Sequence, residues 1–171
     1  MCISLRSYVQ GSTQNSYTKK VLENVNYGWT PGANVNTYLE KIAEIAALHE
    51  QFKPDLTPDQ MLRLGVLKGK YFPDQSPSEN YFKVDASLKE WPSSWHNEEH
   101  PLGWFEWYQN YHAGKRTPDD ERQIKRWKSF KARHLGGLSK ADPTLNDLSV
   151  QPRRRQALLH WGIAPGVKVP E

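Results

Sequence analysis

The amino-acid sequence predicts a mainly α-helical protein, a single compact domain of about five helices with long loops and room for a minor pair of β strands. Apolar residues recur at helical spacing in several segments, and strong helix-start signals precede two of them. The chain has 171 residues, a length that predicts one domain. We expect an irregular N-terminal arm over residues 1–35, one helical domain over 36–165 and a C-terminal tail over 166–171.

The first expected elements are a short strand and a helix. Residues 4–9 alternate briefly between polar and apolar side chains, as a strand does. Residues 36–52 are predicted to form a helix that Pro54 ends. Its apolar positions repeat at helical spacing: Tyr38, Ile42, Ile45, Leu48 and Phe52.

A second helix is expected to start at Thr57. Thr57 offers a cap, Pro58 takes the first helical position and Gln60 completes a capping box. Residues 70–100 are rich in Pro, Ser and Asn and predict a long loop, which in a compact domain is usually functional or wraps the core.

Three further helices are expected in the second half of the chain. Gly114 ends the first of them, and Gly136 with Gly137 ends the second. They are predicted over residues 101–112, from Thr117 to about His134, and over residues 152–161.

Positive charge and tryptophan gather in the same part of the sequence. Residues 1–100 have a net charge of −2, whereas residues 101–161 have a net charge of +6. Six of the seven tryptophans lie at or after Trp91. A local cationic region is what a binding surface for an anionic partner requires.

Basic side chains form one face of the helix predicted from Thr117. Arginine side chains on such a face can fork onto phosphate oxygens, although an ordinary solvated face is the alternative. Further basic residues follow the aromatic segment and lie in the last helix. The candidate anion-binding or nucleic-acid-binding residues are Lys115, Arg116, Arg122, Arg126, Arg133, Arg153 and Arg155.

Residues 103–112 form the densest aromatic run of the chain. A helix that is apolar all round is usually buried, so this run is a candidate core helix. Alternatively, some of its rings line a cleft and stack on a base of single-stranded or flipped nucleotides. The candidate stacking residues are Trp104, Trp107, Tyr111, Trp127 and Trp161.

Three residues are candidates for catalysis. Lys70 lies in a glycine-containing turn that misses the phosphate-binding loop pattern, and could act as a nucleophile or base. Asp85 is a loop carboxylate that could lie near it. Glu106 is the only carboxylate in the aromatic run and could act as an acid or base.

No metal or cofactor is expected. His96 and His100 are four residues apart, but prolines on both sides leave little room for the helix that such a site needs. The single cysteine, Cys2, excludes an internal disulfide framework. No membrane span, secretory signal or lipidation motif is recognised, so we expect a cytoplasmic, intracellular protein with no membrane partner.

A set of short motifs from about residue 56 to 161 resembles a family of small Trp/Arg-rich proteins found in bacteria, fungi and plants. The resemblance implies that the aromatic and arginine segments belong to one unit, and it implies no particular activity. The clearest matching residues are Gly103 to Phe105, Trp107, Tyr108, Tyr111, Gly114 to Arg116, Arg122 to Ile124, Arg126, Trp127, Arg153 and Arg155 to Trp161.

The sequence leaves three functions open. The first is a nucleic-acid-binding domain, which could also be an enzyme acting on DNA or RNA. The second is an enzyme or binding protein in which Arg126 and Arg155 hold a small anionic molecule inside a Trp-lined pocket. The third is an interaction module whose aromatic residues are all core. The oligomeric state stays open.

Overall fold

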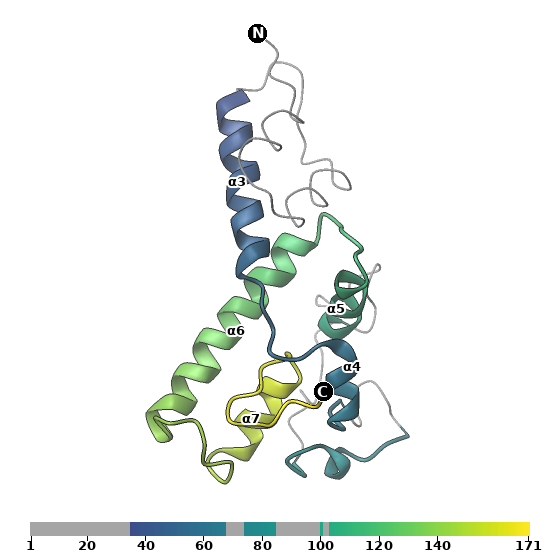
Figure 1. Cartoon of the computed structure of the whole chain (residues 1–171), viewed down its shortest axis with the longest axis vertical. Coiled ribbons are helices and arrows are strands. Elements are labelled where there is room, and N and C mark those ends of the chain that lie inside the picture. The colour runs from purple at the N-terminus through teal and green to yellow at the C-terminus, as the bar shows by residue number, and fades with distance from the viewer. Residues whose placement is uncertain (1–34, 68–73, 85–99, 101–102) are drawn as a thin grey trace. The chain divides into compact units, whose positions relative to one another are not determined.

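The computed structural model describes residues 35–67, 74–84, 100 and 103–171 (Figure 1). The mainly α-helical prediction with about five helices is confirmed, and no strand is present among these residues. The strand suggested for residues 4–9 lies outside them. The elements are α3 (Val35–Gln51), α4 (Pro58–Arg63), the 3-10 helix η1 (Pro77–Glu79), α5 (Trp104–His112), α6 (Asp120–Ala141) and α7 (Pro152–Leu159).

The chain groups into two compact units. The first unit comprises residues 1–53 and 114–125, and the second comprises residues 54–113 and 126–171. Helix α6 starts in the first unit and continues into the second. The arm, domain and tail boundaries expected from the sequence stay a prediction.

In the first unit, α3 follows the apolar pattern that predicted it. Ile42, Ile45, Ala46 and His49 recur at spacings of three or four residues and are all buried. Residues at these spacings share one face of a helix. Phe52, the last residue of the predicted stripe, is also buried, and its amide donates to the carbonyl of His49 at 3.2 Å.

A side-chain cap starts α6 in the same unit. The Thr117 amide and hydroxyl each donate to one carboxylate oxygen of Asp120, both at 3.1 Å. The predicted cap residue is therefore engaged, and regular helix begins three residues later, at Asp120. A carboxylate in the first turn also complements the positive end of the helix dipole.

Burial sets the protonation of His49. Burial, aided by the charge of Arg116 and opposed by that of Glu121, lowers the pKa of His49 from 6.5 to about 4. His49 is therefore neutral inside the first unit at physiological pH.

In the second unit, the capping box predicted for α4 is present. The Gln60 amide donates to the Thr57 hydroxyl at 3.2 Å, and the Thr57 amide donates to the Gln60 side-chain carbonyl at 2.9 Å. Pro58 occupies the first turn, where a missing amide hydrogen costs nothing. The boundaries of this helix are thus fixed by local interactions.

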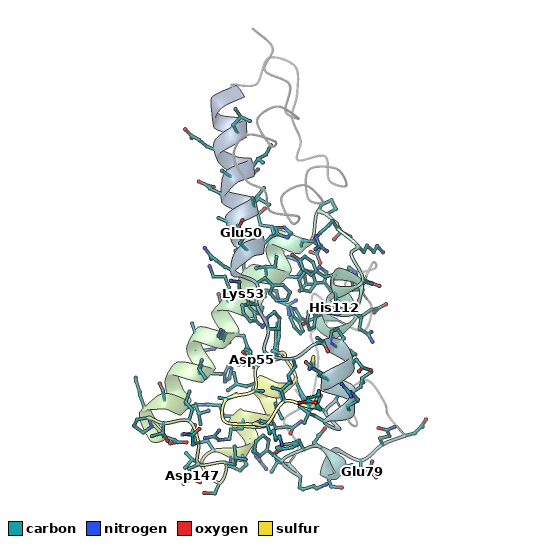
Figure 2. All side chains as sticks on the ribbon, viewed as in Figure 1. Glu50, Lys53, Asp55, Glu79, His112 and Asp147 are labelled. Carbon is teal, nitrogen blue, oxygen red and sulfur yellow. The ribbon has the colours of Figure 1, made fainter. Side chains whose placement is uncertain are left out.

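The C-terminal segment returns to the start of the second unit. The Leu56 amide donates to the Gly162 carbonyl at 3.0 Å. The Ala164 amide donates at 2.9 Å to the carboxylate of Asp55, which is labelled in Figure 2. The Gln60 side chain donates to the Pro170 carbonyl at 2.8 Å. Residues more than 100 positions apart in sequence are thereby joined.

Arg155 of α7 is the central polar residue of the second unit and is 0% exposed. Its Nη2 forms an ion pair with Asp142 at 2.8 Å, and its Nε donates to the Val150 carbonyl at 2.8 Å. Its Nη1 donates to the carbonyls of Leu145 and Pro165 at 3.1 and 2.9 Å. One guanidinium thus joins the loop after α6 to the segment after α7.

The predicted end of the helix that starts near Thr117 is wrong. Helix α6 continues through Gly136 and Gly137 to Ala141, and neither glycine has a positive φ. Leu138, directly after them, is 0% exposed, so burial of this residue favours continued helix over the local preference of glycine. By contrast, Gly114 has a φ of 102° and lies just beyond the end of α5, as predicted.

Replacing Arg155 is expected to destabilise the second unit strongly. Arg155→Met leaves the Asp142 carboxylate buried without its cation, which costs about 3–5 kcal/mol. Urea denaturation measures the loss. Arg153→Met, two positions away and exposed, is the control and is expected to change stability by less than about 0.5 kcal/mol. Equal stability of the two variants would contradict the role of Arg155.

Gly136→Ala is expected to stabilise the protein by about 0.5–1 kcal/mol, because alanine favours helix and the added Cβ meets no atom within 4 Å. Thermal denaturation checks the sign. A helix ending at this glycine would give the opposite result, since alanine is strained in the left-handed conformation of a helix end.

His49 is expected to make stability depend on pH between about 6.5 and 4. Its folded pKa is below its unfolded value, so the unfolded chain takes up the proton first as pH falls. The contribution of neutral His49 to the free energy of unfolding is fully present above about pH 6.5. Acidification through its folded pKa removes up to about 3 kcal/mol of it. Urea denaturation of His49→Gln at pH 7 and pH 4.5 should show a smaller loss than the parent, whereas His112→Gln, which changes an exposed histidine, should not.

Candidate nucleic-acid interface

Four of the five residues predicted to stack on a base belong to the core. Trp104, Trp107 and Tyr111 of α5 and Trp127 of α6 are between 1% and 5% exposed. The Trp127 indole donates to the Trp161 carbonyl at 2.9 Å. Stacking on a ligand is therefore corrected to core packing for these four residues, because their side chains are buried.

Trp161, the fifth candidate, is half-buried and belongs to a column of rings that reaches the surface. Its ring centroid lies 4.9 Å from that of Trp104 and 4.7 Å from that of Phe130, with an angle of 18° to Phe130. The ring centroid of Phe130 in turn lies 4.0 Å from that of His134. We call Trp104, Trp161, Phe130 and His134 the aromatic column. The rings of the column pack against one another. We therefore expect the column to position neighbouring residues rather than to stack on a ligand.

The aromatic column holds one predicted anion-binding residue in place. The Arg126 guanidinium carbon lies 5.6 Å from the centroid of the Trp161 ring, within cation–π distance. Arg126 is half-buried. A stacked guanidinium loses less freedom when it binds an anion, which suits a positioning role for Trp161.

The cations at the start of α6 are largely balanced by their own carboxylates. Arg122 forms a two-pronged pair with Asp119, at 2.6 Å from Nε and 3.0 Å from Nη2. Hydrogen bonding to Asp119 raises the pKa of Arg122. Lys125 pairs with Glu121 at 2.8 Å. These exposed pairs are individually weak, but they reduce the positive field of this part of the helix.

Two further candidates have positions that do not favour ligand binding. Arg116 is 8% exposed, and its Nη1 donates to the Lys115 carbonyl at 2.9 Å. Arg155 is the buried residue described above. Its assignment as an anion-binding residue is corrected to a structural ion pair, because four internal contacts engage all three of its nitrogens. Lys115 itself is exposed.

From Arg126 onward, α6 presents a stripe of cations. Arg126, Arg133 and Lys140 fall within about 40° around the helix axis, because successive spacings of seven residues nearly complete two turns. Arg133 and Lys140 are exposed and form no ion pair within the part of the chain that the structure describes. No acidic residue occurs between Glu121 and Asp142 in the sequence.

Helix α7 adds a cation to this stripe at a glycine. A Cβ built on Gly137 would collide with the Arg154 guanidinium, whose carbon would lie 2.8 Å away. Gly137 lies one turn after Arg133 and one turn before Lys140, so Arg154 fills the gap between them. We define Arg126, Arg133, Lys140 and Arg154 as the cationic patch. Arg153, the other predicted arginine of α7, is exposed beside it in sequence.

Of the three candidate catalytic residues, only Glu106 lies within the described residues. Lys70 and Asp85 lie outside them, as does His96. Glu106 is half-buried in the first turn of α5, and His100 is buried. In the described segments no group of three or more residues of the metal-binding types is found, and no helix there is both long and apolar enough to cross a membrane.

The sequence interpretation missed three residues of this surface: Phe130, His134 and Arg154. Phe130 is apolar, which by itself predicts only a buried position, although helical spacing places it about 40° from Arg126. Arg154 belonged to a run of three arginines that point in different directions. Which of them reaches α6 depends on the packing of α7, for which the sequence contains no local signal.

Comparisons of the chain with protein-family models, with curated proteins and with solved structures found no match.

Proposed function

We propose that the second unit binds nucleic acid through contacts between the cationic patch and backbone phosphates. The observation that supports this most is the twenty-residue stretch from Arg122 to Ala141, which contains seven lysines and arginines and no acidic residue. In its second half, Arg133 and Lys140 lie on one stripe and form no ion pair within the described residues. Such an arrangement repels itself and is stabilised when phosphates approach it.

The length of the stripe suits several phosphates of one strand. Arg126 and Lys140 are separated by fourteen residues, which is about 21 Å along a helix. Arginine contacts phosphate through two parallel hydrogen bonds, so Arg126, Arg133 and Arg154 can each hold one phosphate. Lys140 adds a point charge at the end of the stripe.

The role proposed for the aromatic residues differs from base stacking. Because the aromatic column is packed ring on ring, it supports Arg126 and His134 and leaves base reading to other groups. Contacts to phosphate position a protein but do not read sequence. We therefore propose binding with little base specificity.

Binding of a small anionic molecule in a Trp-lined pocket is the alternative, and two findings weaken it. Arg155, one of its two clamping residues, is committed to Asp142. Trp104, Trp107 and Trp127 are enclosed in the core. The experiment below still separates the two functions.

A fluorescently labelled dT oligonucleotide is expected to bind with an affinity that falls steeply with salt. Four phosphate contacts predict a slope of about −3 in log K against log salt for a single strand, or a loss of about 50-fold between 50 and 200 mM. Fluorescence anisotropy at several salt concentrations measures the slope, and a duplex of equal length tests strand preference.

The double variant Arg133→Gln with Lys140→Gln is expected to weaken binding and to reduce the slope by about 1.4, which is two contacts. The matched control is Arg122→Gln with Lys125→Gln, which removes the same number of charges from the carboxylate-paired part of α6. Absence of binding at 50 mM salt, or equal losses in the two double variants, would overturn the proposal. Binding with a shallow salt slope would favour the small anionic ligand.

A further inference from the structure

Gly137 is where α6 and α7 bring cations together. The Arg154 guanidinium occupies the space that a side chain at position 137 would fill, with its carbon 2.8 Å and its Nη2 3.3 Å from the ideal Cβ. Only glycine leaves this space open. The close contact between the Arg154 guanidinium and α6 therefore requires glycine at position 137.

The donors of this guanidinium are unused in the described structure. Among the described residues Arg154 forms no hydrogen bond and no ion pair, although a guanidinium carries five N–H donors. The residue is half-buried. A partly desolvated cation without a counterion is costly, so its placement calls for an anion that satisfies it.

Two neighbouring residues of α6 lie within one turn of Gly137. Arg133 lies one turn before Gly137 and likewise forms no ion pair in the described segments. His134 is fixed by its 4.0 Å contact with the Phe130 ring. Burial lowers the pKa of His134, and Arg133 on α6 and Arg154 on α7 lower it further. The positive charges of both arginines therefore reach the His134 imidazole.

We propose that Arg133, His134 and Arg154 form a binding site for a terminal phosphate monoester beside Gly137. The inference rests on the proposed function and names a preferred feature of the ligand. An internal phosphodiester carries one negative charge, whereas a terminal monoester carries up to two and presents three unesterified oxygens. Two guanidinium forks and one imidazole match that number of acceptors.

Two matched pairs of oligonucleotides test this proposal. One pair is dT12 with or without a 5′-phosphate, labelled at the 3′ end; the other is dT12 with or without a 3′-phosphate, labelled at the 5′ end. We expect the end-phosphorylated member of at least one pair to bind about tenfold more tightly in fluorescence anisotropy, as an added charge-assisted contact implies. The pair that shows the preference identifies the strand end.

Variants at Gly137 and Arg154 tie the preference to this site. Arg154→Ala removes the donors, and Gly137→Ala displaces the guanidinium, so both are expected to abolish the preference. Gly136→Ala is the control for the glycine, since its Cβ meets no atom within 4 Å. Arg153→Ala is the control for the loss of charge and should weaken both members of a pair equally.

The outcomes separate the two proposals. If phosphorylated and unphosphorylated oligonucleotides bind equally, the terminal-phosphate site is overturned and the proposed function stands. If none of them binds, both fail. A preference that survives Gly137→Ala and Arg154→Ala places the end-recognition elsewhere and also overturns this site.

Discussion

The buried ion pair between Arg155 and Asp142 is the interaction on which the second unit depends. Asp142 also accepts a hydrogen bond from the Asp147 amide at 2.9 Å and from the Thr144 hydroxyl at 3.0 Å. A loop without regular structure is thereby given one conformation. Because Arg155 points inward, the next residue back, Arg154, is rotated by about 100° around α7. Packing of the core thus determines which arginine reaches α6.

The arrangement of aromatic residues follows a similar logic. Aromatic rings and positive charge are close together in the sequence, yet the structure separates them by burial. The large rings of α5 are buried in the second unit, whereas its arginines other than Arg155 are exposed or half-buried. Trp161 and Phe130 connect the two regions. Rings of this size are rigid once packed, so the cations beside them are held at defined positions.

Local signals predicted most of the fold, and tertiary packing decided the rest. The capping box at Thr57 and Gln60 involves residues three positions apart, so it could be recognised in the sequence. The glycines of α6 could not be interpreted in this way, because burial of Leu138 overrides their tendency to end a helix. For the site, helical spacing predicted Arg126 and Arg133 on one face. Arg155 is buried, whereas Arg154 is half-buried beside Gly137. This difference depends on contacts between α7, α6 and the loop after α6.

The return of the C-terminal segment to the start of the second unit has a consequence for the order of folding. Asp55 contacts Ala164 across 109 positions, and Gln60 contacts Pro170 across 110. Contacts of such high sequence separation require closure of a long loop, which slows folding. During synthesis on a ribosome, these contacts cannot form until the segment around residue 170 has emerged. The earlier part of the second unit therefore keeps some of its apolar surface uncovered until the segment around residue 170 packs against it.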